Sequence, residues 1–251
     1  INGGVINSLK NSAKLGKSDW SILEADESDG SFVHIPPTYS IITNIDREHM
    51  DFYKTEKDLK NYFIRFIEKA PSFGKSFICI DDKINCEILK NLNSQNIYTY
   101  GKNIKSNFLI KNIIQKREMT QFDLIVNLPN KKKQIIKSIK IPLIGIHNIR
   151  NSVAAAAVAL TVGITINDIK DGLLKFNGVQ RRFNKIFSLN GVDFYDDYAH
   201  HPTEIKMTLD GVKKVYKDYE KVCVFQPHRI SRLRDLRKDF SFSFQDADIV
   251  I

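Results

Sequence analysis

Over the first hundred residues, short apolar runs alternate with stretches in which apolar side chains recur every three or four positions. The short runs predict strands, and they occupy residues 19–25, 39–45, 76–80 and 97–100. The helical spacing occurs over residues 55–70 and 83–92, and Thr55 with Asp58 forms a weakened capping box at the start of the first helix. Strands and helices that alternate in this way predict a mainly parallel sheet of the α/β class.

The pattern changes at residue 107. From there to residue 141, strand-like runs follow one another without helices, which predicts an antiparallel extension of the same sheet. An alanine-rich helix is expected next, over residues 151–162, and Gly163 is placed to end it. A second helix is expected over residues 167–176, with Asn167 as its cap.

After Phe183 a strand pattern restarts. Residues 186–189 and 192–195 flank Asn190-Gly191, the strongest two-residue hairpin signal. The remaining expected elements are a helix from Pro202, a strand over residues 222–225, a polar helix from about Ser231 and a final strand.

Length and composition fit a division into two parts. A chain of 251 residues has room for one large domain or two smaller ones. We place the boundary at about Asn184, which gives one domain over residues 1–184 and a second over residues 185–251. Hydrophobic residues make up 42% of the chain and charged residues 27%, as in soluble globular proteins. No apolar run reaches the length of a membrane span, so we expect a soluble protein with no membrane partner.

The chain is basic, with 38 Lys and Arg residues against 29 Asp and Glu residues and a formal net charge of +9. Such a balance makes a nucleic-acid-binding module an alternative function. The only tight basic run, Lys131-Lys132-Lys133, follows a turn signal, and no nucleic-acid-binding motif accompanies it. We therefore expect a solvated loop tip there and no nucleic-acid partner. The three cysteines lack metal-ligand spacing, which indicates free thiols in the reducing cytoplasm.

Four of the six residues at positions 24–29 carry carboxylates, and this segment lies at the end of an expected strand. They would repel one another unless a cation or a basic partner neutralised them. The next expected strand leads to His49, and neighbouring parallel strands would bring Glu24 and His49 to one crevice at the edge of the sheet. A carboxylate with an imidazole is a reasonable site for Mg²⁺, and a solvated acidic loop is the alternative.

Two further clusters have the chemistry of a nucleotide site. His147, Asn148 and Asn151 lie at the start of the alanine-rich helix, and amide side chains donate and accept hydrogen bonds as an adenine edge requires. Helix capping would use the same residues. Arg181 and Arg182 lie at the expected domain junction, where paired arginines suit a phosphate-rich ligand and plain surface charge is the alternative.

The C-terminal part contributes two more clusters, each at the end of an expected strand. The hairpin leads into Asp196-Asp197-Tyr198-Ala199-His200-His201-Pro202, and the later strand leads into Gln226-Pro227-His228-Arg229. Arg232 follows one helical turn after Arg229, and the two guanidinium groups could together hold a carboxylate or a phosphate.

In their order along the chain, these motifs resemble those of the Mur ligase family. The segments that carry the resemblance are Glu-Ala-Asp-Glu-Ser-Asp at 24–29, Thr-Asn-Ile at 43–45, His-Met-Asp at 49–51, His-Asn…Asn at 147–151, Arg-Arg-Phe at 181–183, Asp-Asp-Tyr-Ala-His-His-Pro-Thr-Glu at 196–204 and Phe-Gln-Pro-His-Arg at 225–229. The resemblance implies a central ATPase domain followed by a truncated Rossmann-like C-terminal domain. It also implies a cytoplasmic bacterial enzyme that uses ATP and Mg²⁺ to join L-alanine to the carboxylate of UDP-N-acetylmuramate in peptidoglycan synthesis.

The resemblance also assigns roles to single residues. Those expected to hold Mg²⁺ are Glu24 and His49, which with Arg182 and His200 form the expected catalytic set. The expected ATP-binding residues are His147, Asn148, Asn151, Arg181, Arg182, Asp197 and Tyr198. The residues expected to contact the muramoyl carboxylate or the incoming alanine are Ser28, His200, His228, Arg229 and Arg232.

One segment looks like part of a phosphate-binding loop but does not match its pattern. Gly16-Lys17-Ser18 resembles the end of a phosphate-binding loop, but Asn11 stands where that loop needs glycine. By comparison with the family, the chain starts shortly after the phosphate-binding loop of the central domain and stops partway into the C-terminal domain. We therefore expect a piece of a longer protein that lacks the loop and is inactive alone. The alternatives are a recycling ligase that attaches a tripeptide to the same nucleotide and a remnant that binds nucleotide without turnover.

Overall fold

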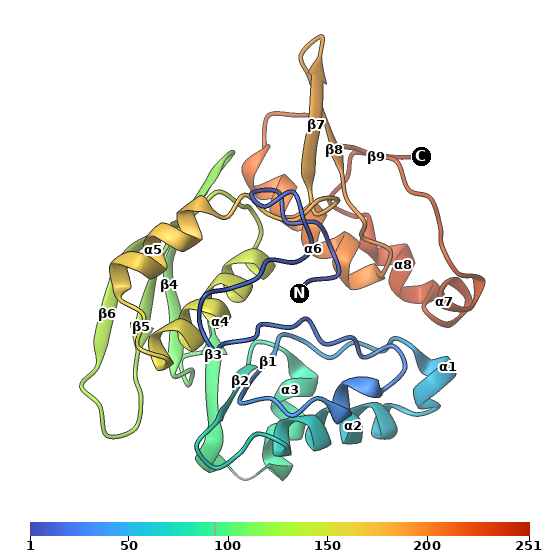
Figure 1. Cartoon of the computed structure of the whole chain (residues 1–251). Coiled ribbons are helices and arrows are strands. Elements are labelled where there is room, and N and C mark those ends of the chain that lie inside the picture. The colour runs from blue at the N-terminus through green and yellow to red at the C-terminus, as the bar shows by residue number, and fades with distance from the viewer. Residues whose placement is uncertain (93) are drawn as a thin grey trace.

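A six-stranded sheet forms the centre of the larger part of the molecule (Figure 1). The computed structural model describes residues 1–92 and 94–251. The strands lie side by side in chain order, and they are β1 (Tyr39–Ile42), β2 (Lys75–Cys79), β3 (Ile97–Gly101), β4 (Phe108–Lys116), β5 (Met119–Val126) and β6 (Gln134–Ile141). The strands β1 to β4 pair in parallel, and β4, β5 and β6 pair antiparallel. The expected parallel sheet with an antiparallel extension is thereby confirmed.

Helices cover both faces of this sheet (Figure 1). One face carries η1 (Ser31–His34), α1 (Met50–Tyr53), α2 (Glu56–Glu68), α3 (Lys83–Ile88), η2 (Leu89–Asn91) and η3 (Ser94–Asn96). The other face carries α4 (Ile146–Thr161) and α5 (Ile166–Lys175). Two apolar clusters result, one around Phe77, Phe108 and Val153 beneath α4, and one around Phe32 and Leu59 beneath α2. The expected cap of α2 is present, because Thr55 Oγ1 accepts a hydrogen bond from the Asp58 amide at 3.1 Å.

The C-terminal part has its own small core. Its elements are β7 (Asn184–Leu189), β8 (Val192–Asp196), α6 (Pro202–Val215), β9 (Val222–Cys223), α7 (Ile230–Asp235), α8 (Arg237–Ser243) and β10 (Ile249–Val250). Leu209 of α6 and Phe240 of α8 are buried in this core. The turn between β7 and β8 has φ of 49° at Asn190 and 81° at Gly191, the left-handed pair that a type I′ hairpin requires, so the hairpin prediction is confirmed.

Three local predictions are wrong. Residues 19–25 form no strand, because β1 lies at the edge of the sheet and the Glu24 amide bonds instead to the carbonyl of Ile1 at 3.1 Å. The alanine-rich helix begins at Ile146, five residues before its expected start. The cap of α5 is Thr165, whose hydroxyl accepts from the Asp168 amide, and Asn167 lies inside the helix.

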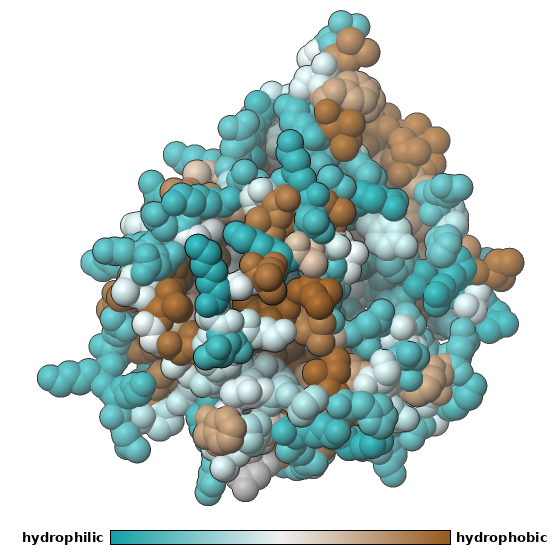
Figure 2. Space-filling view, in the orientation of Figure 1, coloured by the Kyte–Doolittle hydropathy of each residue, from teal (hydrophilic) through white to brown (hydrophobic). Residues whose placement is uncertain are grey.

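Apolar side chains stay uncovered along the first 25 residues. Leu15 is 96% exposed and Ile22 is 83% exposed, because this segment makes no ladder with the sheet. Figure 2 shows apolar side chains near the middle of this face, around the N-terminal segment that Figure 1 colours blue. Within the described residues, every helix is too short or too polar to cross a membrane.

Candidate functional site

A pocket opens where the loop after β1 meets α7, and the two segments lie about 180 residues apart in sequence. We name it the junction pocket. The residues that line it are Arg47, Glu48, His49, Met50, Asp51, Arg229, Ser231, Arg232, Asp235 and Leu236. The fold thus brings the expected metal ligand His49 together with two expected carboxylate-binding residues, Arg229 and Arg232.

Glu48 connects the two sides of this pocket. Its Oε1 accepts a hydrogen bond from Arg232 Nε at 2.9 Å and a second, shorter one from Arg232 Nη2. The same oxygen lies 3.9 Å from His200 Nε2. Sequence reasoning gave Glu48 no role, although its place between Arg47 and His49 after an apolar run could have drawn attention to it.

His49 lies against a different carboxylate from the expected one. Its backbone is left-handed, with φ of 55°, and its Nε2 lies 3.8 Å from Glu27 Oε1. Burial raises the pKa of Glu27 in spite of the nearby imidazole. The Glu24 carboxylate instead accepts the Gly3 amide at 2.7 Å, and the Ser28 amide bonds to Asp26 at 2.8 Å. No three His, Cys, Asp or Glu residues of the described chain are grouped so that they could hold a metal.

His147 lies in the first turn of α4 and faces the junction of the two parts. Burial lowers its pKa to about 4, and the positive charges of Arg150 and Arg182 act in the same direction. Its Nδ1 is buried and has no hydrogen-bond partner among the described residues. A neutral imidazole with a free ring nitrogen can donate at one nitrogen and accept at the other.

The two asparagines near His147 differ in their environment. Asn148 Nδ2 donates to the carbonyl of Ile144 at 2.7 Å, so one side of its amide is tied to the chain that enters α4. Asn151 is exposed one turn further along the helix. Of the two, Asn151 therefore has the freer amide.

Arg182 and the segment after the hairpin form a network of hydrogen bonds. Arg182 Nη1 lies 3.2 Å from Glu204 Oε1, while Glu204 Oε2 accepts the amides of His200 and His201 at the start of α6. Burial alone would raise the pKa of Glu204, but these amides and the charges of His200 and Arg182 outweigh it, and the pKa is lowered.

Asp197 organises the turn before α6. Its carboxylate accepts the amides of Phe183 and Ala199, both at 2.7 Å. Burial nevertheless raises its pKa. Arg181 stacks on the ring of Tyr198, with the guanidinium carbon 4.5 Å from the ring centre. The expected ATP-binding residues of this region therefore lie close together at the junction.

Among the expected substrate-binding residues near α7, His228 and Arg229 are exposed and Arg232 is buried. His228 and Arg229 have exposed side chains at the start of α7. The His228 carbonyl accepts from Arg232 Nη1 at 3.2 Å, so it helps to orient that guanidinium. Arg232 itself is buried, with 9% of its surface exposed.

An ion pair that sequence reasoning also missed fixes α4 to the sheet. Arg150 Nε donates to Asp81 Oδ2 at 2.8 Å, and the Asp81 carboxylate also accepts the amides of Lys102 and Asn103. Nothing in the local pattern links residues 69 positions apart, so only the tertiary structure reveals this pair.

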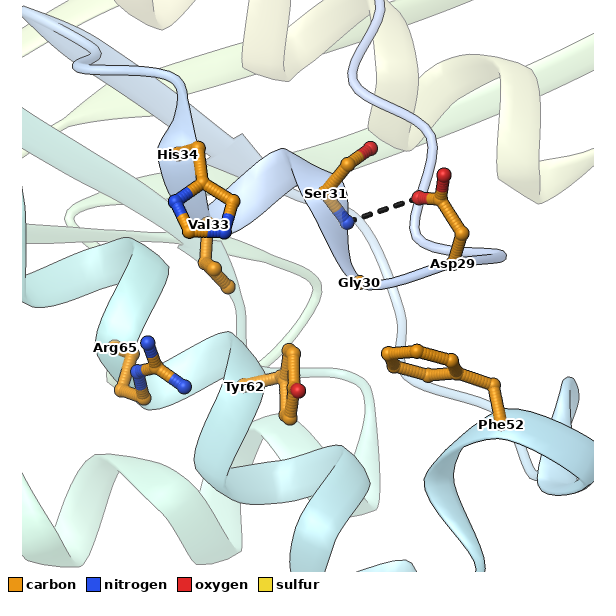
Figure 3. A pocket seen from close by; sticks show the side chains of 8 residues that line it. All are labelled: Asp29, Gly30, Ser31, Val33, His34, Phe52, Tyr62 and Arg65. Carbon is orange, nitrogen blue, oxygen red and sulfur yellow. Dashed lines mark hydrogen bonds between the residues drawn. The ribbon is translucent and has the colours of Figure 1, made fainter.

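A second pocket, of about 290 Å³, lies on the α2 side of the acidic loop (Figure 3). Its lining residues are Asp29, Gly30, Ser31, Val33, His34, Phe52, Tyr62 and Arg65. It contains none of the expected site residues. His34 lies on its wall.

Comparison with protein families gives two matches that together cover most of the chain. Residues 5–159 match the Mur ligase middle domain, and residues 181–251 match the Mur ligase glutamate ligase domain.

Individual relatives agree with this result. The chain is 68% identical over all 251 residues to the UDP-N-acetylmuramate–L-alanine ligase of Pelagibacter ubique, and 44% identical to that of Rickettsia africae. It spans 54% and 52% of these two proteins, about half of their length. The chain is also similar to the crystal structure of the UDP-N-acetylmuramate-alanine ligase of Thermotoga maritima, with a TM-score of 0.70 and 25% sequence identity. The matched region covers 90% of this chain and 47% of the Thermotoga maritima chain.

Proposed function

The chain belongs to the Mur ligase family, and from that premise we propose that it is part of an ATP-dependent ligase that joins L-alanine to the carboxylate of UDP-N-acetylmuramate. The relative with 68% identity over the whole chain has this name, which favours L-alanine over a tripeptide as the acceptor. The chain covers about half of that relative, so the activity is proposed for the longer protein.

The observation that carries the proposal is the junction pocket. It places His49 from the central part opposite Arg229 and Arg232 from the C-terminal part. A ligase of this kind must hold a phosphate-bearing nucleotide and a carboxylate side by side. The junction pocket supplies the proposed metal ligand His49 and two arginines that suit a carboxylate, and the proposed ATP-binding residues lie outside its lining.

ATP fits the residues around His147. The buried Nδ1 of that ring has no hydrogen-bond partner among the residues that the structure describes, and a bound base would supply one. We propose that His147, Asn148 and Asn151 contact the adenine. Arg181, Arg182, Asp197 and Tyr198 would hold the rest of the nucleotide from the other side of the junction. Arg182 would neutralise negative charge on the phosphates.

For Mg²⁺ we propose Glu24 and His49 as ligands. Mg²⁺ in such sites binds through one or two protein groups and several waters, so a full protein cluster is not required. Glu27, beside His49, is a further carboxylate of the right chemistry. When bound, the ion would supply positive charge to the phosphates during transfer.

In the proposed reaction, the muramoyl carboxylate attacks the γ-phosphate of ATP and forms an acyl phosphate, with ADP leaving. The amine of L-alanine then attacks the acyl carbon, the amide bond forms and inorganic phosphate leaves. His200 and Arg232 would orient the carboxylates, with Ser28, His228 and Arg229 completing the substrate contacts.

We further propose a cytoplasmic location and the domain boundary near Asn184.

The decisive experiment measures phosphate release that depends on both ATP and L-alanine. A protein of the relatives' length that contains this chain is expected to show it, and the 251-residue chain alone is expected not to. Replacing L-alanine by a tripeptide is expected to abolish turnover. Turnover with the tripeptide only would contradict the proposal and favour a recycling ligase.

A further inference from the structure

The guanidinium of Arg232 already holds a carboxylate, that of Glu48. Both the Nε and the Nη2 of Arg232 donate to Glu48 Oε1, the first at 2.9 Å. Hydrogen bonds between a guanidinium and a carboxylate are charge-assisted and roughly twice as strong as those between neutral groups. This edge of Arg232 is therefore taken by a residue of the same chain.

His200 faces the same oxygen atom. Its Nε2 lies 3.9 Å from Glu48 Oε1, and its backbone is fixed by Glu204 at the start of α6. Two groups that suit a substrate carboxylate thus converge on one side chain from the opposite part of the molecule. The side chain of Arg232 is only 7% exposed in this arrangement, and Glu48 occupies its Nε and Nη2 donors.

The ion pair between Glu48 and Arg232 differs from the structural ion pair between Asp81 and Arg150. Asp81 also accepts two backbone amides, so moving it would take the partner from the Lys102 and Asn103 amides as well as from Arg150. The hydrogen bonds that the described residues donate to the Glu48 side chain all come from Arg232. Glu48 lies in the loop beyond the end of β1, and a change of its side-chain rotamer would release Arg232 without taking a partner from any backbone amide of the described chain. An incoming carboxylate would then have to replace Glu48 as the partner of the buried guanidinium.

We propose that Glu48 is an internal carboxylate ligand, which occupies Arg232 and His200 and which a substrate carboxylate replaces. The identity of that substrate rests on the proposed function, but the exchange of one carboxylate for another does not. Such competition lowers the apparent affinity for the incoming carboxylate by the fraction of time that Arg232 is free. Glu48 would thereby set how much substrate is needed to fill the site.

The test measures the rate at which phenylglyoxal modifies each arginine of the 251-residue chain, read by mass spectrometry. Glu48→Gln is expected to raise the rate at Arg232 about tenfold, because a neutral amide holds a guanidinium less firmly than a carboxylate. The control is Glu87→Gln, which makes the same change of charge at the ion pair with Lys60. It is expected to leave the rate at Arg232 unchanged. The rate at Arg150 is expected to stay constant in both variants.

Protection by added carboxylates completes the test. Acetate is expected to protect Arg232 in Glu48→Gln at about tenfold lower concentration than in the unchanged chain. Protection by L-alanine at lower concentrations than acetate would support the proposed function as well. Protection by acetate without any advantage for L-alanine would support the internal ligand and count against the proposed function.

Three results would overturn the proposal. One is an equal rate at Arg232 in the unchanged chain and in Glu48→Gln. Another is protection by acetate at the same concentrations in both. The third is a rise at Arg150 as large as that at Arg232, since it would mean that the substitution loosens the whole fold.

Discussion

His147 is held neutral by its position at the junction. Its folded pKa of about 4 lies below the ordinary 6.5, because burial and two nearby arginines oppose its protonation. Protonation therefore opposes folding. The contribution to stability is complete above pH 6.5 and is lost as the pH falls toward 4.

This position of His147 predicts a measurable pH dependence of stability. Between pH 7 and pH 4 the unchanged chain is expected to lose up to about 3 kcal/mol more of its unfolding free energy than His147→Gln, which has no imidazole to protonate. Urea unfolding at several pH values measures the difference. His34→Gln, at an exposed histidine, is the control and is expected to match the unchanged chain. Parallel pH curves for the unchanged chain and His147→Gln would contradict the prediction.

The absence of a side chain at Gly145 leaves room for the imidazole ring of His147. Its φ is 90°, and an added Cβ would lie 2.5 Å from His147 Cε1. Gly145→Ala is therefore expected to lower the unfolding free energy by about 2–4 kcal/mol, from both the backbone and the ring contact. Gly163→Ala is the matched control, because its φ is 87° and a Cβ there would meet nothing within 4 Å. Thermal unfolding of both variants separates the two effects, and equal losses would show that the ring contact contributes nothing.

At the scale of single elements, helix ends were harder to predict than helices. The apolar spacing predicts the helix α5, but its N-cap is Thr165, two residues before the expected Asn167. Thr165 and Asn167 are both good capping residues, and the choice between them depends on where the backbone turns. Thr165 Oγ1 accepts the Asp168 amide at 3.2 Å and lies 2.6 Å from Asp168 Oδ2.

The cap of α5 leads to the next prediction. Thr165→Ala is expected to lower the unfolding free energy by about 1 kcal/mol, because it leaves the Asp168 amide without its partner. Asn167→Ala is expected to change it by less than about 0.5 kcal/mol, since alanine is favoured inside a helix. Denaturant unfolding of the two variants compares them directly. A larger loss of unfolding free energy in Asn167→Ala than in Thr165→Ala would contradict the prediction and indicate that Asn167 is the cap.

At the scale of the whole molecule, contacts between the two parts position the site. Gly211 of α6 packs closely on the backbone of Gly145. A Cβ added at Gly211 would lie 3.0 Å from the Cα of Gly145. On the same side, Arg117 in the turn between β4 and β5 lies over the ring of Tyr219 at 4.1 Å and over that of Tyr216 at 5.5 Å. These contacts hold α6 against the central part.

Removing one of them is expected to loosen the junction. Arg117→Ala should lower the unfolding free energy by about 0.5–1 kcal/mol and speed amide hydrogen exchange in α6, because two ring contacts are lost. Arg65→Ala, which removes a similar contact with Tyr62 inside the central part, is the control. It should leave exchange in α6 unchanged. Faster exchange in α6 in both variants, or in neither, would count against a specific role of Arg117.

The sequence by itself determined the class of the fold and most of its elements. Periods of two and of about 3.6 residues report which side chains face a core, and these are local properties of the chain. The hairpin at Asn190-Gly191 was equally local, because its turn depends on two residues that tolerate positive φ. The Mur ligase motifs are short runs of neighbouring residues, so they too could be recognised without a structure.

Only the tertiary structure decided which of these groups meet. The strand expected over residues 19–25 failed because a strand needs a partner, and apolar spacing does not say whether one is available. The contact of Glu48 with Arg232, like that of His49 with Glu27, depends on how the loops at the junction pack against each other. Side chains 184 residues apart come together through the sum of many packing contacts, which no local pattern contains.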